Sequence, residues 1–379
     1  MQQVKKEENA PLTNTFSITI VGSGVSTAIP VIGHFSGNCA CAAALKDMNG
    51  PNRRNNVSLL ITVPSRDASH SDGAVKHILI DCGKTFRDAY FRVLAKHKVQ
   101  YVDALLITHD HADAVAGIDD LRDLQYMTVD ENDDWFVKQY ISTYTSAKTV
   151  NNMKEQFGYI YRNSRLVGPA PESKEAHEAL LQHFTEECKQ KKISNNIGKR
   201  RSTALDFFTL PDTIPTPFYI PALGSDFPMY AVPVEHGAGY MSLGFVFGRG
   251  VAFHSVGATP LDIKDKSCVV YLSDVSFIPE AAMSFLQDLV KIDVLIVDLL
   301  YGPGKRHPTH YCMDDVIRLV ELLQPIRTYG IGMYCDVEHT KGNEYLCERL
   351  EELRRNGKCS DRVISVMLGF DALDIPLPL

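Results

Sequence analysis

His109, His111 and Asp113 lie within five residues of one another, directly after the apolar run 104–107. An apolar run of this length is typical of a buried strand. A strand that ends here would present two imidazoles and a carboxylate in one small volume, and zinc, manganese and iron all suit such ligands. Histidine and aspartate also collect in solvated loops and at helix starts, so the rest of the chain must decide between the two interpretations.

Three further apolar runs end in a carboxylate. The runs 77–80, 269–273 and 294–297 precede Asp81, Asp274 and Asp298. Runs rich in valine, isoleucine and leucine are typical of strands buried on both faces. The sequence therefore predicts several buried strands that deliver polar groups to one edge.

This pattern resembles the metallo-β-lactamase fold, in which two β-sheets are sandwiched between helices and the metals lie at the strand ends. Residues 109–114 resemble the family's H-x-H-x-D-H motif, with Ala114 in place of the last histidine. The segments around His236 and Asp274 resemble those that bring the next metal histidine and the bridging aspartate. The resemblance implies an α/β fold, an αββα sandwich of two mixed β-sheets flanked by helices.

Within that superfamily, the chain resembles the phosphoribosyl cyclic phosphate phosphodiesterases of bacterial phosphonate breakdown and their eukaryotic homologues. Segments beyond the metal motifs fall in that group's order, namely 22–26, the pair Cys39 and Cys41, 52–61, 157–160 and 307–310. The resemblance covers most of residues 16–340. It implies a metal-dependent phosphodiesterase that acts on a small, possibly cyclic, phosphodiester.

The chain has 379 residues, which an α/β sandwich with insertions can reach as one unit. We expect a disordered N-terminal lead over 1–14 and a single domain over 15–379. The stretch 163–203 is polar, helix-prone around 172–192 and basic at Lys199, Arg200 and Arg201, which predicts an insertion. Such a basic cluster is usually solvated surface, with contact to an anionic substrate or RNA as the alternative.

Composition is that of an ordinary globular protein, with 45% hydrophobic and 22% charged residues. No apolar run is long enough for a membrane helix, and the first fourteen residues lack the apolar core of a signal peptide, so we expect a cytoplasmic protein without membrane contact.

Nine cysteines without a secretory signal favour reduced thiols or metal ligation over disulfides. The net charge of −7 argues against a large nucleic-acid footprint, and a homodimer remains open.

Local patterns predict four elements with particular clarity. Residues 16–21 alternate as a strand does, and apolar residues recur at helical spacing from Phe86 to Leu94 and from Val316 to Leu323, before Pro325. A further helix is expected over 345–355. The helix that begins at Phe86 should lie on the outside of the sheet.

The resemblance also implies roles for single residues. His109, His111 and His236 would be the imidazole ligands of a first divalent ion, zinc or manganese, with Asp274 bridging toward a second. Asp113 and Asp274 match the second site, but Ala114 and Gly332 replace its two histidines. Since two carboxylates hold an ion weakly, we expect one strong site and a weak, empty or rearranged second one. His339 is either a substitute ligand or a structural histidine.

A second metal site is implied near Cys39 and Cys41, which resemble part of a structural zinc site in the bacterial relatives. Ala44 occupies the position of a third cysteine, and Cys335 falls where the fourth ligand would be. A thiolate is a competent zinc ligand. The alternative is that these are buried cysteines that act as small apolar residues.

A mechanism follows from the first site. A bound divalent ion lowers the pKa of its water from about 15.7 toward about 7 and so supplies hydroxide at neutral pH. Asp113 and Asp274 would orient it, and His310, or else His307, would protonate the leaving oxygen. The alternative for the two histidines is that they cap the following helix at Asp314.

Other functions remain open, because a fold does not determine its substrate. Glyoxalase II, a thioester hydrolase, and tRNase Z, an RNA endonuclease, share the fold and the first motif. A nucleic-acid substrate is possible but not favoured, since only the insertion could form a basic arm. The loss of two expected histidines also allows a scaffold protein that binds metal without catalysis.

Overall fold

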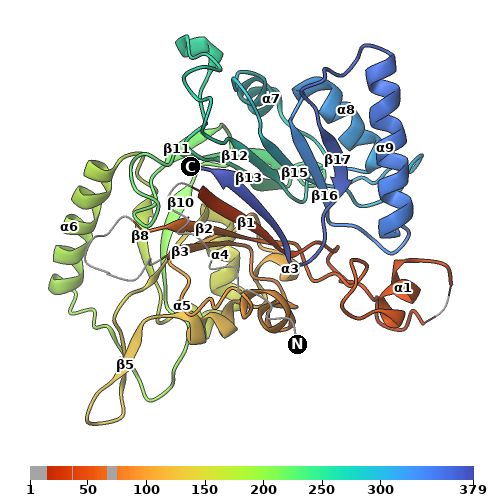
Figure 1. The fold of residues 1–379 in the computed structure, drawn as a ribbon. Helices are drawn as coiled ribbons and strands as arrows, with labels where there is room; N and C mark the ends of the chain where they lie inside the picture. The colour runs from red at the N-terminus through yellow and green to blue at the C-terminus, as the bar shows by residue number, and fades with distance from the viewer. Residues whose placement is uncertain (1–14, 36, 66–74) are drawn as a thin grey trace, which may run out of the picture.

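A computed structural model describes residues 15–35, 37–65 and 75–379, and the expected N-terminal lead lies outside this part of the chain. Two β-sheets face each other and helices cover their outer faces, so the predicted αββα architecture is confirmed (Figure 1). No helix within the described ranges has the length and apolar character needed to cross a membrane.

The first sheet has eight strands in the order β18-β1-β2-β3-β4-β7-β10-β8. From β3 to β8 neighbouring strands are parallel, and the others are antiparallel. The predicted strand at 16–21 lies within β1. The bounds are β1 (Thr15–Gly22), β2 (Ser58–Pro64), β3 (Val75–Ile80), β4 (Ala104–Leu106), β7 (Ile141–Ser146), β8 (Arg165–Pro169), β10 (Leu205–Leu210) and β18 (Leu373–Pro378).

The second sheet has seven strands in the order β11 to β17. Its strands are antiparallel up to β14 and parallel from β14 to β17. The bounds are β11 (Thr216–Phe218), β12 (Met229–Glu235), β13 (Met241–Phe247), β14 (Val269–Leu272), β15 (Val294–Asp298), β16 (Arg327–Ile331) and β17 (Ser365–Leu368).

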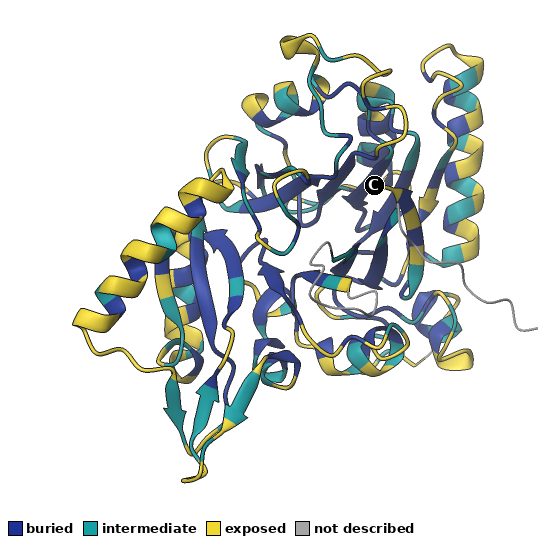
Figure 2. Ribbon diagram, turned by 60° about the vertical axis from the view of Figure 1, so that its left-hand side comes forward, coloured by how far each residue is buried: buried dark blue, intermediate teal, exposed yellow. Residues whose placement is uncertain are grey.

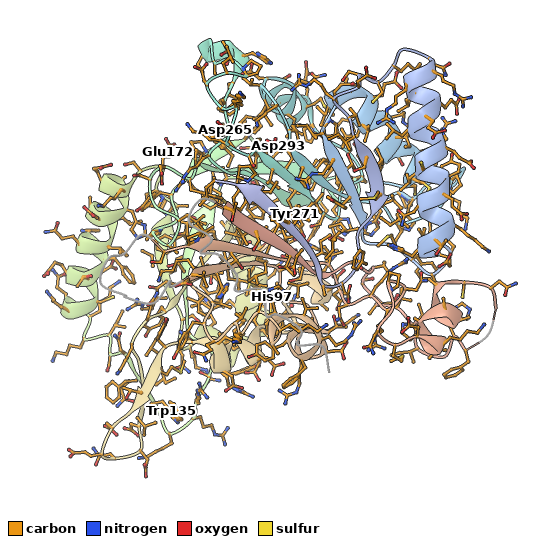
Figure 3. The ribbon with its side chains drawn as sticks, in the orientation of Figure 1. His97, Trp135, Glu172, Asp265, Tyr271 and Asp293 are labelled. Atoms are coloured by element: carbon orange, nitrogen blue, oxygen red, sulfur yellow. The ribbon has the colours of Figure 1, made fainter. Side chains whose placement is uncertain are left out.

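A small third sheet of β5 (Met127–Val129), β6 (Trp135–Val137) and β9 (Asn196–Gly198) projects from one side of the molecule (Figure 1). The sequence patterns did not predict it. Trp135 lies in this projection, whereas Tyr271 lies at the centre of the molecule, between the two large sheets (Figure 3). Phe16, Phe245 and Tyr271 are almost fully buried there, and burial of each such side chain stabilises the fold by about 2–3 kcal/mol.

Helices close the outer face of each large sheet. The first sheet is covered by α2 (Phe86–Ala89), the π-helix η1 (Tyr90–Leu94), α3 (Ala112–Val115), the 3-10 helix η2 (Ile118–Leu124), α4 (Ala147–Gln156) and α5 (Gly158–Tyr161). The second sheet is covered by α7 (Glu280–Gln287), α8 (Met313–Leu323) and α9 (His339–Arg355). Two short helices lie apart from these, α1 (Ala40–Lys46) and the 3-10 helix η3 (His254–Val256).

The helices predicted from periodicity are confirmed, but α9 begins six residues before its expected start. Glu338 caps this helix, because its carboxylate accepts a hydrogen bond from the Lys341 backbone N–H at 3.1 Å. The first turn of α9 is polar and so lacked the apolar stripe that marks a helix.

The expected insertion contains β8, α6 (Lys174–Gln190) and β9. The Ser173 hydroxyl caps α6 by accepting a hydrogen bond from the Ala176 N–H at 3.2 Å. The helix lies beside the outer strands of the first sheet and exposes most of one face (Figure 2).

Parallel pairing brings the functional loops to one edge. Ile80 of β3 is level with Leu106 of β4, and Leu272 of β14 is level with Val297 of β15. Asp81 and the 108–113 segment therefore leave the first sheet together, while Asp274 and Asp298 leave the second together. The Leu243 N–H donates to the Thr108 carbonyl at 3.0 Å and joins the two sheets at this edge.

Candidate metal centre

The three predicted imidazole ligands converge. His109 and His111 follow β4, and His236 follows β12. One ring nitrogen from each lies within 4.8 Å of those of the other two. The centroids of His109 and His111 are 4.6 Å apart, and each lies 5.2 Å from that of His236. His109 and His236 are buried and His111 is exposed, so the cluster opens to solvent on one side.

The protonation state of His109 and His236 favours the binding of a metal cation. The His236 Nδ1 lies 2.7 Å from the Thr309 carbonyl, to which it donates, and this leaves Nε2 with a free lone pair. The His109 Nε2 is buried and has no hydrogen-bond partner among the described residues. Burial lowers the pKa of both rings, so both are neutral at pH 7. Neutral imidazoles with unused lone pairs are what a divalent metal requires, and the residues fit the ion that the fold family implies.

A hydrogen-bonded chain behind His109 fixes its orientation. The His109 Nδ1 lies 2.8 Å from the Thr108 hydroxyl, which in turn donates to Asp81 at 2.8 Å. The Thr108 N–H donates to the other Asp81 oxygen, also at 2.8 Å. Burial nevertheless raises the pKa of Asp81 to about 8. The sequence indicated Asp81 only as a strand-end carboxylate, and the structure gives it this supporting position.

Two carboxylates border the imidazoles. An Asp113 oxygen lies 4.0 Å from the His109 Nε2, and an Asp274 oxygen lies 3.9 Å from the His236 Nε2. Burial, together with the charges of Asp113 and Asp298, raises the pKa of Asp274 well above its usual range. Asp274 also holds a positive φ of 50°, a conformation that costs about 1–2 kcal/mol for a non-glycine residue. A cation here would offset the repulsion among these carboxylates.

Asp274 also joins a second cluster with His236 and His310. The His310 Nδ1 lies 2.7 Å from an Asp298 oxygen and 3.9 Å from Asp274. Burial alone would lower the pKa of His310, but the charge and hydrogen bond of Asp298 outweigh it and raise that pKa to about 9. His310 is therefore a cationic donor beside the imidazole cluster. The sequence patterns placed Asp298 at a strand end but gave it no role.

His307 has a different environment. Its ring centroid lies 5.3 Å from that of His310, and burial lowers its pKa. Neither histidine caps the following helix, because the N-cap of α8 is Cys312, whose backbone N–H is bound by Asp315 at 2.9 Å. The alternative of a helix-capping pair is thus wrong.

The positions of the two missing histidines are closed. Ala114 is buried among the apolar residues under the first sheet. Gly332 has a φ of +79°, and a Cβ there would lie 2.7 Å from an Asp298 oxygen. His339 lies away from both clusters at the start of α9, where its ring contacts Phe370 at 5.7 Å.

A separate group near α1 contains His34, Cys39, Cys41 and Cys335, whose ligand atoms all lie within 4.8 Å of one another. The Cys39 Sγ is 3.8 Å from the His34 Nε2, and the Cys41 Sγ accepts the Val31 N–H at 3.3 Å. The sequence analysis missed His34, although it lies only five residues before Cys39. Three thiols and one imidazole form a common ligand set of structural zinc.

Two residues that lie beside the imidazole cluster, Tyr240 and Lys148, were not predicted from the sequence. The Tyr240 ring stacks on His111 at 4.9 Å, and the Lys148 ammonium lies 4.2 Å from the centre of the Tyr240 ring. The Tyr240 hydroxyl donates to Asp110, which also accepts a hydrogen bond from Asn152. Lys148 is exposed, so its charge faces the solvent side of the cluster.

Comparisons with known proteins bear on the family and on the fold. A family described as "Beta-lactamase superfamily domain" matches residues 76–333. A diphosphatase of the PhnP family superimposes with a TM-score of 0.60 over 96% of this chain and 99% of that chain, at 21% identity. Zinc-bound PqqB from Methylobacterium extorquens superimposes with a TM-score of 0.54 over 95% of this chain and 99% of that one, at 12% identity.

Among curated proteins, an octanoyltransferase of Porphyromonas gingivalis (strain ATCC BAA-308 / W83) is 28% identical over 150 residues. This match covers 39% of the present chain and 24% of the octanoyltransferase. The matched segment is therefore a minor part of that relative, and the structural likenesses, all below 25% identity, bear on the fold alone.

Proposed function

The chain belongs to the metallo-β-lactamase superfamily of metal-dependent hydrolases, and from that premise we propose that it hydrolyses a small, possibly cyclic, phosphodiester. The observation that carries the proposal is the position of Asp274, one oxygen of which lies 3.9 Å from the His236 Nε2 and 3.9 Å from the His310 Nδ1. Asp274 thus borders the cluster of three imidazoles and also His310, which is held by Asp298 and whose ring centroid lies 4.7 Å from that of His236.

His109, His111 and His236 would hold one divalent ion, zinc or manganese, with Asp274 beside it. When bound, such an ion supplies Lewis acidity and lowers the pKa of a coordinated water. Asp113 and Asp274 would orient the attacking water by accepting its hydrogen bonds. A second ion would be held weakly, because Ala114 and Gly332 contribute no ligand.

The remaining residues suit a phosphate better than a thioester. His310 would donate the proton on its Nε2 to the leaving oxygen, and Asp298 orients the ring and stabilises its cationic form by accepting the Nδ1–H hydrogen bond. Lys148, near Tyr240 and His111, would attract an anionic substrate. A thioester carries no charge at the reacting group and would not need this cation.

We also propose that His34, Cys39, Cys41 and Cys335 hold a structural zinc ion. His34 replaces the third cysteine of the bacterial pattern and completes a set of four ligands. This ion would tie the loop before α1 to the segment after β16, which are already linked by the Ala40 N–H and the Cys335 carbonyl at 2.8 Å.

A tRNA substrate is less well supported. In the basic run of the insertion, Arg201 pairs with Asp123 at 2.7 Å and Lys199 with Asp134 at 3.1 Å. Paired cations release fewer counterions from RNA and so contribute less to affinity. Arg200 alone in this run has no ion-pair partner within the described ranges.

Hydrolysis of bis-p-nitrophenyl phosphate by the zinc- or manganese-loaded protein tests the proposal. We expect turnover that falls at least about 100-fold in His111→Ala, since one ligand is lost, and is unchanged in the exposed control His254→Ala. A folded, metal-loaded protein without turnover on this or any small phosphodiester would instead support the scaffold alternative.

A further inference from the structure

A cavity of about 770 Å³ lies between α6 and the first sheet, at the outer strands β7, β10 and β8. The lining residues on the strands are Arg165, the first residue of β8, Ser142 and Asp206, the second residues of β7 and β10, and Phe208, the fourth residue of β10. Because β4, β7 and β10 are parallel, the catalytic loop leaves from the other ends of these strands. The cavity is therefore separate from the metal centre, and its size is ordinary for a small-molecule site.

An ordered cation lies against one wall of this cavity. The Arg165 guanidinium donates to both oxygens of Asp206, at 2.6 Å each, and its centre lies 3.6 Å from the centre of the Tyr140 ring. The same guanidinium is 5.3 Å from Phe184 of α6. These contacts hold Arg165, Asp206 and Tyr140 in place before any ligand arrives.

A second part of the wall is aromatic and carries an unsatisfied polar atom. His177 is only 5% exposed, and its ring lies 5.4 Å from Phe208 and 5.7 Å from Tyr219. Its Nδ1 is buried without a hydrogen-bond partner among the described residues. A buried polar nitrogen without a partner costs about 1–3 kcal/mol, which a ligand seated against this wall would offset.

The cavity is basic although the chain is acidic. Five cationic residues line it against the two carboxylates Glu178 and Asp206, whereas the whole chain carries −7. The five are Lys138, Arg165, Lys174, Lys189 and Lys192.

Two of these lysines remain available. Lys174 lies 3.8 Å from Glu178 and Lys189 lies 2.7 Å from Glu186. Lys138 and Lys192 are exposed and have no carboxylate partner in the part of the chain that the structure describes. Their charges are therefore free to meet an anion at the mouth of the cavity.

We propose that this cavity binds a small phosphate ester that carries an aromatic ring, of the size of a nucleoside monophosphate. The ring would lie against His177 and Tyr219, and the phosphate would meet Lys138 and Lys192. The ligand needs both its ring and its phosphate, because the aromatic walls of the cavity would stack on the ring and the lysines at its mouth would attract the phosphate. The proposal does not depend on the proposed hydrolytic function.

Isothermal titration calorimetry of the full chain with adenosine and uridine 5′-monophosphates tests it, with adenosine and inorganic phosphate as the two half-ligands. We expect saturable one-site binding of a monophosphate, and affinity at least about tenfold weaker for each half-ligand. The double variant Lys138→Gln with Lys192→Gln should weaken binding about tenfold through the two lost charges. Lys191→Gln, the neighbour that does not line the cavity, should not.

Three outcomes would overturn the proposal. The first is no saturable binding of either monophosphate up to about 1 mM, the weak limit of specific affinity. The second is equal affinity in the double variant and the native chain. The third is loss of binding in His111→Ala with no effect of the lysine changes, which would assign the nucleotide to the metal centre instead.

Discussion

The His310 Nδ1 lies 2.7 Å from Asp298, and the same carboxylate lies next to the position where a Cβ on Gly332 would stand. One buried aspartate thus connects the candidate proton donor to the glycine that replaces an expected metal ligand. A side chain at position 332 would therefore press against the carboxylate that orients His310.

Asp298→Asn should lower kcat for a phosphodiester about 100-fold with little change in KM, since Asp298 positions the proton donor without contacting substrate. The pKa of His310 is about 9 because of Asp298, and a general acid loses activity as pH rises through its pKa. The alkaline limb of the kcat profile should therefore move to lower pH in Asp298→Asn. An unchanged limb would contradict the assignment of His310 as the acid.

Gly332→Ala should lower both stability and activity, because the new methyl group would lie against Asp298 and because the φ of +79° disfavours alanine. Gly304 is the matched control, since its φ is +73° and a Cβ there meets nothing within 4 Å. Chemical denaturation should give a loss of about 1 kcal/mol for Gly304→Ala and a clearly larger one for Gly332→Ala. Equal losses and normal turnover in both would refute the steric account.

Cys335→Ser should remove one equivalent of zinc from the purified protein and lower its melting temperature, because a structural metal contributes its binding free energy to folding. Cys347→Ser provides the control, since Cys347 is exposed and outside the cluster. Metal analysis and thermal unfolding of both variants check this. If native zinc content survives in Cys335→Ser, the four residues do not form a zinc site.

His339 should make the fold sensitive to acid. Burial and the Arg54 cation lower the pKa of His339 to about 4, below its usual value of 6.5, so folding favours the neutral ring. The stabilisation is complete above pH 6.5 and is lost as pH falls from there toward 4. At pH 5 the free energy of unfolding should be about 2 kcal/mol lower than at neutral pH. Urea unfolding should show that this loss is absent in His339→Gln and retained in the exposed control His254→Gln. If the free energy of unfolding depended on pH in the same way in both variants, His339 would not be the source of the acid sensitivity.

Much of the fold could be predicted because its strands are continuous apolar runs that end in carboxylates. Runs such as 294–297 are apolar throughout because helices and a second sheet cover both faces. The start of α9 could not be predicted, since a side-chain cap and not an apolar stripe begins it. The small third sheet was missed because its strands have only three residues each.

The candidate site was predictable where its residues fall in one short motif and not where they meet across the fold. His109 and His111 are two residues apart, whereas His34 meets Cys335 and Asp298 meets His310 only once loops have closed. Tyr240 lies in the turn between β12 and β13 and Lys148 lies in α4, so their sequences carry no signal of a shared site. The cavity under α6 likewise depends on how the insertion packs, which composition alone does not determine.

The most direct test of the account measures metal content by plasma mass spectrometry and bis-p-nitrophenyl phosphate hydrolysis on the same zinc- or manganese-loaded samples of the native chain and His111→Ala. We predict that His111→Ala loses one equivalent of metal and its turnover together, while remaining folded. Turnover that survives the loss of this ion, or a native chain that neither binds metal beyond the cysteine cluster nor turns over substrate, would contradict the claim that the three imidazoles form a hydrolytic metal centre.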